Sequence, residues 1–227
     1  MGVYFSPKSR DYDPGGFLPS YRGLLVLLLQ SHLEFEVITP KTLAEFHGQV
    51  LVLPNATVLT NAEKQSLKQF ADNGGRLVIT GHNATGFTAS EHIAPFKNCP
   101  ASFYLGKLEK NFIDGSQEMP KEFLTVMGVK SEIEIEAPPT LAVNFGRVNG
   151  APHLFFANFT GLVPGKIAIP TGVSGAKVNI PASMGNSLAY LPFLGQTQIL
   201  PGTKHGDTVQ FELPPIERGA VAWVVGN

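Results

Sequence analysis

The first 80 residues alternate short apolar runs with longer segments of mixed polarity. Apolar runs occur at residues 3–5 (VYF), 35–40 (FEVITP), 49–54 (QVLVLP) and 76–81 (RLVITG). QVLVLP is apolar at successive positions, which is typical of a strand that helices cover on both faces of a parallel sheet. The four runs therefore predict the strands of one sheet.

Two segments between these runs predict helices. The first opens near residue 20 and passes through the leucine cluster to about residue 33. The second begins at Thr60, where T-N-A-E predicts a capping box between the Thr60 hydroxyl and the Glu63 carboxylate, and it ends at Gly74-Gly75. Strands and helices that alternate at these short spacings predict a doubly wound α/β domain with a mainly parallel sheet and right-handed crossovers.

From about Ala137 the pattern changes to short apolar runs bounded by glycine or proline, without helical periodicity between them. Asn149-Gly150 is a strong hairpin signal because both residues tolerate positive φ. About eight runs of this kind predict an antiparallel β-sandwich. They include KIAIP, AKVNIP, SLAYLPF, TQILP, TVQFELPP and GAVAWVVG.

We therefore expect an α/β domain over residues 1–132 and a β-sandwich domain over residues 133–227. The weakest part of this prediction is residues 87–136, where the periodicity is poor and PKEFLTVMG is the clearest helix candidate. Because the VYF run begins within a residue or two of the start, we also expect a longer protein with an upstream segment.

Composition narrows the range of partners. Hydrophobic residues make up 43% of the chain and charged residues 15%, which indicates a compact folded protein. With a net charge of −1 and no cluster of Lys or Arg, we expect no nucleic-acid or acidic-membrane partner.

The longest apolar run, residues 24–29, is about a third of the roughly 18 residues that span a bilayer. Cys99 is the only cysteine, so no intrachain disulfide can form and the compartment stays undetermined.

Ligands of open parallel sheets bind at the carboxyl ends of the strands. Three loops are predicted there: the loop after Phe5, the corner at Asn55-Ala56, and the loop Gly81-His82-Asn83. We predict a ligand-binding role for six residues of these loops, Lys8, Arg10, Asp11, Asn55, His82 and Asn83.

Each of these candidate residues has a simple structural interpretation beside the functional one. Lys8 and Arg10 suit an anion or a partner carboxylate, and Asp11 with Asp13 has the composition of a glycosidase carboxylate pair. The default interpretation of all four is solvated loop residues that face water. His82 is a remnant base or a loop histidine bonded to backbone or solvent. The histidines have no metal-binding spacing, so we assign no metal and no cofactor.

Several stretches carry a family resemblance. VYFSPKSRDYDP, LLLQSHLEFEVITP and VLVLPNATVLTNAEKQSLKQFADNGGRLVITG together resemble the class I glutamine amidotransferase-like domain of many glycoside hydrolases, above all the trimerisation domain of family 42 β-galactosidases. IEAPPTLAVNFGRVNGAPHLFFANFTG through VQFELPPIERGAVAWVV resembles the small β-sandwich that follows it there. The resemblance implies a flavodoxin-like or amidotransferase-like sheet, an accessory role, and sugar chemistry that belongs to a separate barrel.

The resemblance also indicates where the cysteine nucleophile of an amidotransferase would lie, and this chain has no cysteine there. Amidotransferases carry a cysteine in a G-x-C-x-G elbow after this strand, whereas this chain has G-H-N-A-T, with Asn83 at about that position. An amide is not a useful nucleophile, so we predict no catalytic residue here. The leading hypothesis is a non-catalytic accessory or oligomerisation region of a glycoside-hydrolase-like protein, which pairs with copies of itself or with an upstream catalytic domain.

Two other classes of function stay open, so whether the chain is an enzyme is undecided. One is a small hydrolase with a site at the strand ends, built from His82, Asp11 or Cys99, although a half-buried thiol without an activating partner is the simpler interpretation of Cys99. The other is a carbohydrate-binding module. Exposed coplanar aromatics on one sheet, such as Tyr190 or Phe193, would favour it, and their burial would dismiss it. We expect Trp223 to be a core residue.

Overall fold

The computed structural model describes residues 1–111, 120–129, 131–163 and 165–225. By their contacts the described residues divide into two compact units, one formed mainly by residues 1–107 and 120–129 and the other mainly by residues 131–225. Each unit has its own buried core. Part of the stretch with poor periodicity, residues 112–119 and 130, lies outside the described residues.

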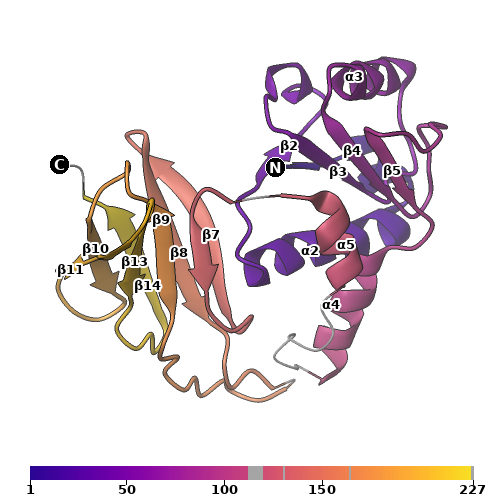
Figure 1. The fold of residues 1–227 in the computed structure, drawn as a ribbon. Coiled ribbons are helices and arrows are strands. Elements are labelled where there is room, and N and C mark those ends of the chain that lie inside the picture. The colour runs from indigo at the N-terminus through magenta and orange to yellow at the C-terminus, as the bar shows by residue number, and fades with distance from the viewer. Residues whose placement is uncertain (112–119, 130, 164, 226–227) are drawn as a thin grey trace. The chain divides into compact units, whose positions relative to one another are not determined.

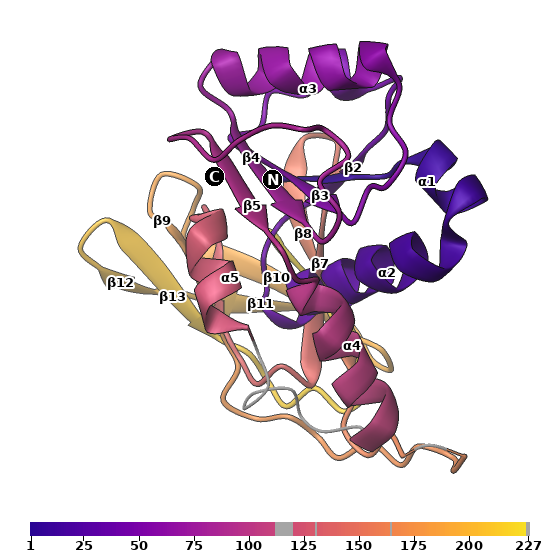
Figure 2. The same ribbon diagram turned by 90° about the vertical axis from the view of Figure 1, so that its right-hand side faces the viewer.

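The first unit is built on five parallel strands in the order β2-β1-β3-β4-β5 (Figure 1). The strands are β1 (Gly2–Tyr4), β2 (Glu36–Ile38), β3 (Val50–Pro54), β4 (Arg76–Thr80) and β5 (Ile93–Phe96). The helices are α1 (Pro7–Tyr12), α2 (Pro14–Gln30), α3 (Asn61–Asp72), α4 (Pro100–Asn111) and α5 (Lys121–Met127), with a 3-10 helix η1 (Leu43–Glu45). Both views place α2 and α3 on opposite faces of the sheet (Figures 1 and 2). The predicted α/β unit with a parallel sheet is therefore confirmed.

Burial on both faces explains the unbroken apolar runs. Every residue of β3 is buried. Leu51 and Leu53 pack in one core cluster with Leu67 and Ala71 of α3. Because successive side chains of a strand point to opposite faces, the fully buried Val52 faces the other side of the sheet. A strand in this position has no solvent-facing side that would call for alternating polar residues.

Three local features differ from the sequence prediction. The stretch after Phe5, expected to be a loop, contains α1, where the Ser6 side chain caps the helix by accepting from the Ser9 N–H and Pro7 takes the first helical position. Helix α2 begins at Pro14, six residues before the expected start. Strand β5 was not predicted, because its four residues include Pro95 and only one of them is buried.

The second unit is an antiparallel sandwich of two sheets, as predicted. The sheets have the strand orders β11-β10-β14-β8-β7 and β12-β13-β9-β6. Their strands are β6 (Glu134–Glu136), β7 (Leu141–Val148), β8 (Ala151–Asn158), β9 (Lys177–Pro181), β10 (Ser187–Pro192), β11 (Gln198–Pro201), β12 (Thr203–His205), β13 (Thr208–Glu212) and β14 (Gly219–Val224). Asn149 and Gly150 form the predicted turn between β7 and β8, with φ of 51° and 82°.

Two predictions about the sandwich were wrong. KIAIP, residues 166–170, forms no strand, and Ile167 and Ile169 are 93% and 78% exposed. Trp223 lies half-buried instead of in the core, and its ring stacks on His153 with centroids 5.5 Å apart. Both errors have one cause, since an apolar run in the sequence does not show which of its side chains are buried, and apolar residues also contribute much of the exposed surface of folded proteins.

A buried hydrogen-bond network joins β1 to the start of α3. The Tyr4 hydroxyl donates to Glu63 Oε1 at 2.7 Å, and the Thr60 hydroxyl and N–H donate to Glu63 Oε2 at 2.6 and 2.8 Å. The Glu63 N–H donates to Thr60 Oγ1, which confirms the predicted capping box. Burial alone raises the pKa of Glu63, but the hydrogen bonds from Thr60 and Tyr4 and the charge of Lys8 outweigh it, so the net pKa is lowered.

This network generates a prediction about acid stability. A carboxyl group whose pKa is lowered in the folded state contributes stability above its unfolded pKa, and the contribution is lost as pH falls through the folded pKa. We expect Glu63→Gln to lower the free energy of unfolding at pH 7 by about 1–3 kcal/mol. The difference between variant and wild type should shrink as pH falls below about 4.5, which urea unfolding between pH 3 and 7 measures.

The matched control is Glu91→Gln, because Glu91 is an exposed carboxylate in the same unit. A destabilisation of Glu63→Gln that stays constant across this pH range would show that the Glu63 charge has no part in the network.

Candidate functional site

The carboxyl ends of β3, β4 and β5 bring three loops of the first unit together. Asn55 forms the corner after β3, with φ of 50°, and its N–H donates to the Thr80 carbonyl at 3.0 Å. Gly81 forms the corner after β4, with φ of 70°. Cys99 directly precedes α4, and its carbonyl accepts from the Phe103 N–H at 3.1 Å. The positive φ at both corners turns the chain sharply away from the sheet.

The space in front of Gly81 is filled. A Cβ atom built at position 81 would lie 2.3 Å from Asn55 Oδ1 and 2.5 Å from Cys99 Sγ. Both distances are far below van der Waals contact, so any side chain here would have to displace its neighbours. The same Asn55 Oδ1 accepts a hydrogen bond from the His82 N–H at 2.8 Å, which fixes the amide in place.

Asn55 also borders the start of α2. Asp13 Oδ1 accepts from the Gly16 N–H at 3.1 Å in the first turn of that helix. A Cβ atom at Gly16 would lie 3.0 Å from Asn55 Nδ2. The Asn55 amide therefore lies between the first turn of α2 and the corner at Gly81. We call Gly16, Asn55, Gly81 and Cys99 the edge cluster.

The charged candidates of the first loop lie outside the edge cluster. Lys8, Arg10 and Asp11 are exposed residues of α1. Arg10 Nε donates to Asp11 Oδ1 at 2.7 Å, and this hydrogen bond lowers the pKa of Asp11. Lys8 lines a cavity of about 340 Å³ together with Glu63. These three residues are thus placed for contact with solvent or a partner.

The candidates of the third loop have different roles. The Asn83 amide donates to the Phe87 carbonyl at 2.8 Å, and its oxygen accepts from the Thr85 hydroxyl, so this side chain holds its own loop together. The His82 residue is exposed and reaches the edge cluster through its backbone N–H. The corner residue after β4 is Gly81, two positions before Asn83. Of the six predicted residues, the structure brings together Asn55 and the backbone of His82.

The closeness of Cys99 to Gly81 was not predicted from the sequence. Cys99 was a candidate for a hydrolase site at the strand ends, but without a predicted β5 the sequence did not show which strand precedes it. The available signals were Cys99-Pro100, which suits the start of a helix because proline is favoured in the first turn, and a glycine directly after an apolar strand.

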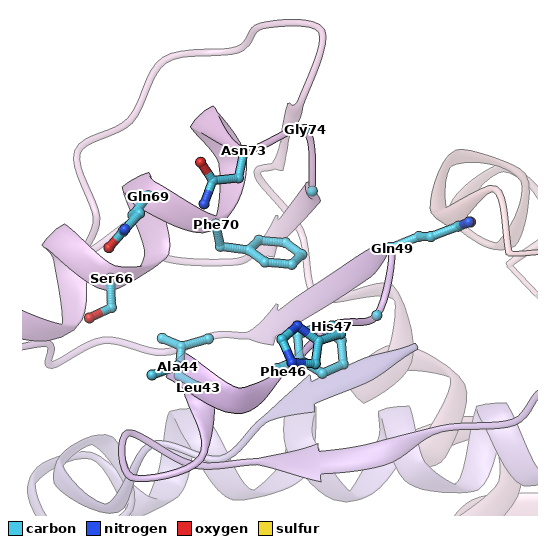
Figure 3. A pocket seen from close by; sticks show the side chains of 12 residues that line it. Leu43, Ala44, Phe46, His47, Gln49, Ser66, Gln69, Phe70, Asn73 and Gly74 are labelled. Carbon is cyan, nitrogen blue, oxygen red and sulfur yellow. The ribbon is translucent and has the colours of Figure 1, made fainter.

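A second cavity lies at the opposite edge of the sheet. Its volume is about 520 Å³, and its lining includes Phe46, His47, Gln49, Phe70 and Asn73 (Figure 3). Gln49 directly precedes β3, so this cavity lies at the amino ends of the strands, away from the edge where ligands of such sheets bind.

Residues 1–111, 120–129, 131–163 and 165–225 contain no group of three or more His, Cys, Asp or Glu side chains arranged to hold a metal ion. Within the same ranges, no helix is both long and apolar enough to cross a membrane.

Comparison with known proteins identifies the fold. No protein-family model and no curated protein matches the sequence. Among solved structures, α-L-fucosidase isoenzyme 2 from Paenibacillus thiaminolyticus is similar with a TM-score of 0.68 and 11% identity, over 100% of this chain and 48% of that chain. The fold is related to that of glycoside hydrolases. A β-galactosidase from Bacillus circulans sp. alkalophilus is similar with a TM-score of 0.53 and 11% identity, over 99% of this chain and 41% of that chain. The chain thus spans less than half of either enzyme.

The crowding at Gly81 generates a stability prediction. Gly81→Ala should lower the free energy of unfolding by about 3 kcal/mol, the sum of a left-handed backbone cost of about 1–2 kcal/mol and an overpacking cost of about 1–3 kcal/mol. Urea unfolding at pH 7 measures it.

Gly86→Ala is the matched control, because Gly86 has a similar φ of 74° but nothing within 4 Å of a built Cβ atom. Its free energy of unfolding should fall only by the cost of the left-handed backbone, about 1–2 kcal/mol. Equal losses in the two variants would mean that Asn55 and Cys99 leave room for a side chain.

Proposed function

We propose that this chain is a non-catalytic accessory region of a glycoside-hydrolase-like protein, with a degenerate amidotransferase-like first unit that supports assembly. The observation that carries the proposal is the filled space in front of Gly81. In an elbow-type site the residue at this sharp turn after the strand presents the nucleophile. Here the turn residue Gly81 has no side chain, and the Asn55 amide and the Cys99 thiol fill the space in front of it. Asn83, at about the nucleophile position of the G-x-C-x-G pattern, is an amide that donates to the Phe87 carbonyl of its own loop.

The strand order supports the amidotransferase-like assignment. The order β2-β1-β3-β4-β5 matches the flavodoxin-like arrangement of doubly wound sheets. Fold alone assigns no activity, so we infer a degenerate site from the residues at the carboxyl edge.

The alternative of a small hydrolase has less support at this edge. Acyl transfer needs a nucleophile next to a base, with backbone donors facing the reacting atom. Cys99 contacts the Gly81 corner, where its neighbour is the Asn55 amide, which is not a base. Asp11 is paired with Arg10 and Asp13 holds the first turn of α2, so both carboxylates already have structural partners.

Exposed aromatic side chains favour assembly as the role. Tyr12 of α1 is 78% exposed and Phe103 of α4 is 66% exposed. Both helices start from the carboxyl edge, α1 after β1 and α4 after β5. Exposed aromatic residues are enriched at interfaces because they bury a large area with few rotatable bonds. We propose a second copy of the chain as the first partner, with the catalytic domain of a glycoside hydrolase as a further one.

Sedimentation velocity over a hundredfold concentration range tests the proposal. We expect a mass of at least two chains at high concentration. The double variant Tyr12→Ser/Phe103→Ser should weaken the association by roughly tenfold or more, because each buried aromatic contributes on the order of 1 kcal/mol or more.

The matched control is Ile167→Ser, which removes an apolar side chain that is 93% exposed in the sandwich unit. It should leave the association unchanged. A single-chain mass at every concentration would contradict self-assembly, and dissociation by Ile167→Ser alone would move the interface to the sandwich.

A further inference from the structure

The cavity at the amino ends of the strands lies between α3 and residues 43–49 (Figure 3). Residues at spacings of three and four lie on one face of a helix. The helical wall of the cavity is one such stripe, formed by Ser66, Gln69, Phe70 and the C-cap residue Asn73. In Figure 3 the Phe70 ring projects from the helix, whereas Gln49 points away from the other lining side chains. A ligand between the two walls would therefore meet this stripe of α3.

Two phenylalanine rings form the apolar part of the cavity. Phe46 is buried and Phe70 is half-buried, and their ring centroids lie 5.6 Å apart with 33° between the ring planes. A Cβ atom built at Gly48 would lie 2.4 Å from Phe46 Cζ, and one built at Gly75 would lie 2.4 Å from Phe70 Cζ. Neither glycine has a positive φ, so the rings are what require glycine there. Because the two rings are in contact, a ligand can pack on the accessible side of Phe70 but not between the rings.

The polar side chains of the lining are uncharged amides, a hydroxyl and an imidazole. Gln69, Asn73, Ser66 and His47 are exposed. Within the described part of the chain, none of these four side chains has a hydrogen-bond partner in the protein. Each amide offers a donor group and an acceptor oxygen, so these side chains are available to bond a ligand.

The charged side chains of α3 lie on a different stripe of the helix. Lys68 and Asp72 form an ion pair one turn apart, and both line another cavity. The lining of the cavity in Figure 3 includes no Asp, Glu, Lys or Arg among the described residues. A ligand with a net charge would therefore lose water there without meeting an opposite charge, which favours a neutral ligand.

We propose that this cavity binds a neutral oligosaccharide of two or three pyranose units. A sugar ring has an apolar C–H face, which packs on Phe70, and hydroxyl edges, which exchange hydrogen bonds with Gln69 and Asn73. The volume of about 520 Å³ lies within the range of roughly 300–1,000 Å³ for small-molecule sites and is more than one sugar ring fills. A planar heterocycle suits the cavity less well, because it stacks best between two parallel rings. The site is separate from the proposed assembly surface at Tyr12 and Phe103.

NMR titration of the full chain with maltotriose, cellotriose and β-1,4-galactotriose tests the proposal. At least one trisaccharide should cause saturable shift changes in the side-chain amides of Gln69 and Asn73 and in the ring protons of Phe70. D-Sorbitol should cause none, because it has similar hydroxyls but no ring face. Adenosine, a neutral planar heterocycle, should also cause none.

The double variant Gln69→Ala/Asn73→Ala should weaken trisaccharide binding roughly tenfold or more, because it removes two hydrogen-bonding amides. Both side chains are exposed and have no partner in the described part of the chain, so the thermal midpoint should stay close to that of the wild type. Gln65→Ala is the matched control, because Gln65 is an exposed amide of the same helix outside the cavity lining. It should bind the trisaccharide like the wild type.

Three results would overturn the proposal: no trisaccharide saturates, sorbitol shifts the same signals equally, or the double variant binds as tightly as Gln65→Ala. Saturable binding of adenosine without any trisaccharide would also overturn it and would assign the cavity to a planar heterocycle. These outcomes do not depend on the assembly test, which changes Tyr12 and Phe103.

Discussion

The lack of space at Gly81 is the constraint on which the interpretation of the first unit depends. Packed interiors tolerate almost no overlap, and here an amide oxygen and a sulfur lie 2.3 and 2.5 Å from the position that a Cβ atom would take. The Asn55 amide is itself fixed by the His82 N–H. The corner turns at Gly81 with a φ of 70°, and its neighbours fill the space in front of it. The sharp backbone turn at this edge therefore does not by itself indicate a reactive side chain.

Much of the architecture could be predicted because it depends on strong local patterns. Burial on both faces produces the unbroken run of β3, the capping box marks the start of α3, and Asn149-Gly150 marks the hairpin between β7 and β8. Each of these signals needs only a few neighbouring residues. The change from helical to strand periodicity near residue 137 predicted the sandwich for the same reason.

The candidate site was less predictable because it depends on contacts between distant segments. Cys99 reaches Gly81 only through β5, a short edge strand with a proline that has no clear strand signal. Asn83 lies at about the nucleophile position of the G-x-C-x-G pattern, and the left-handed residue directly after β4 is Gly81. Likewise, Tyr190 is buried and Phe193 is exposed, although both aromatic residues lie in one apolar run of the sequence. The run alone does not predict this difference.

The Cys99 thiol packs against the corner at Gly81, and we expect no activated thiolate there. Its alkylation rate tests this most directly. Iodoacetamide should modify Cys99 more slowly at pH 7 in the native protein than in guanidinium chloride, because the sulfur packs against Gly81. Faster modification of the native protein would reveal an activated thiolate and would contradict the account.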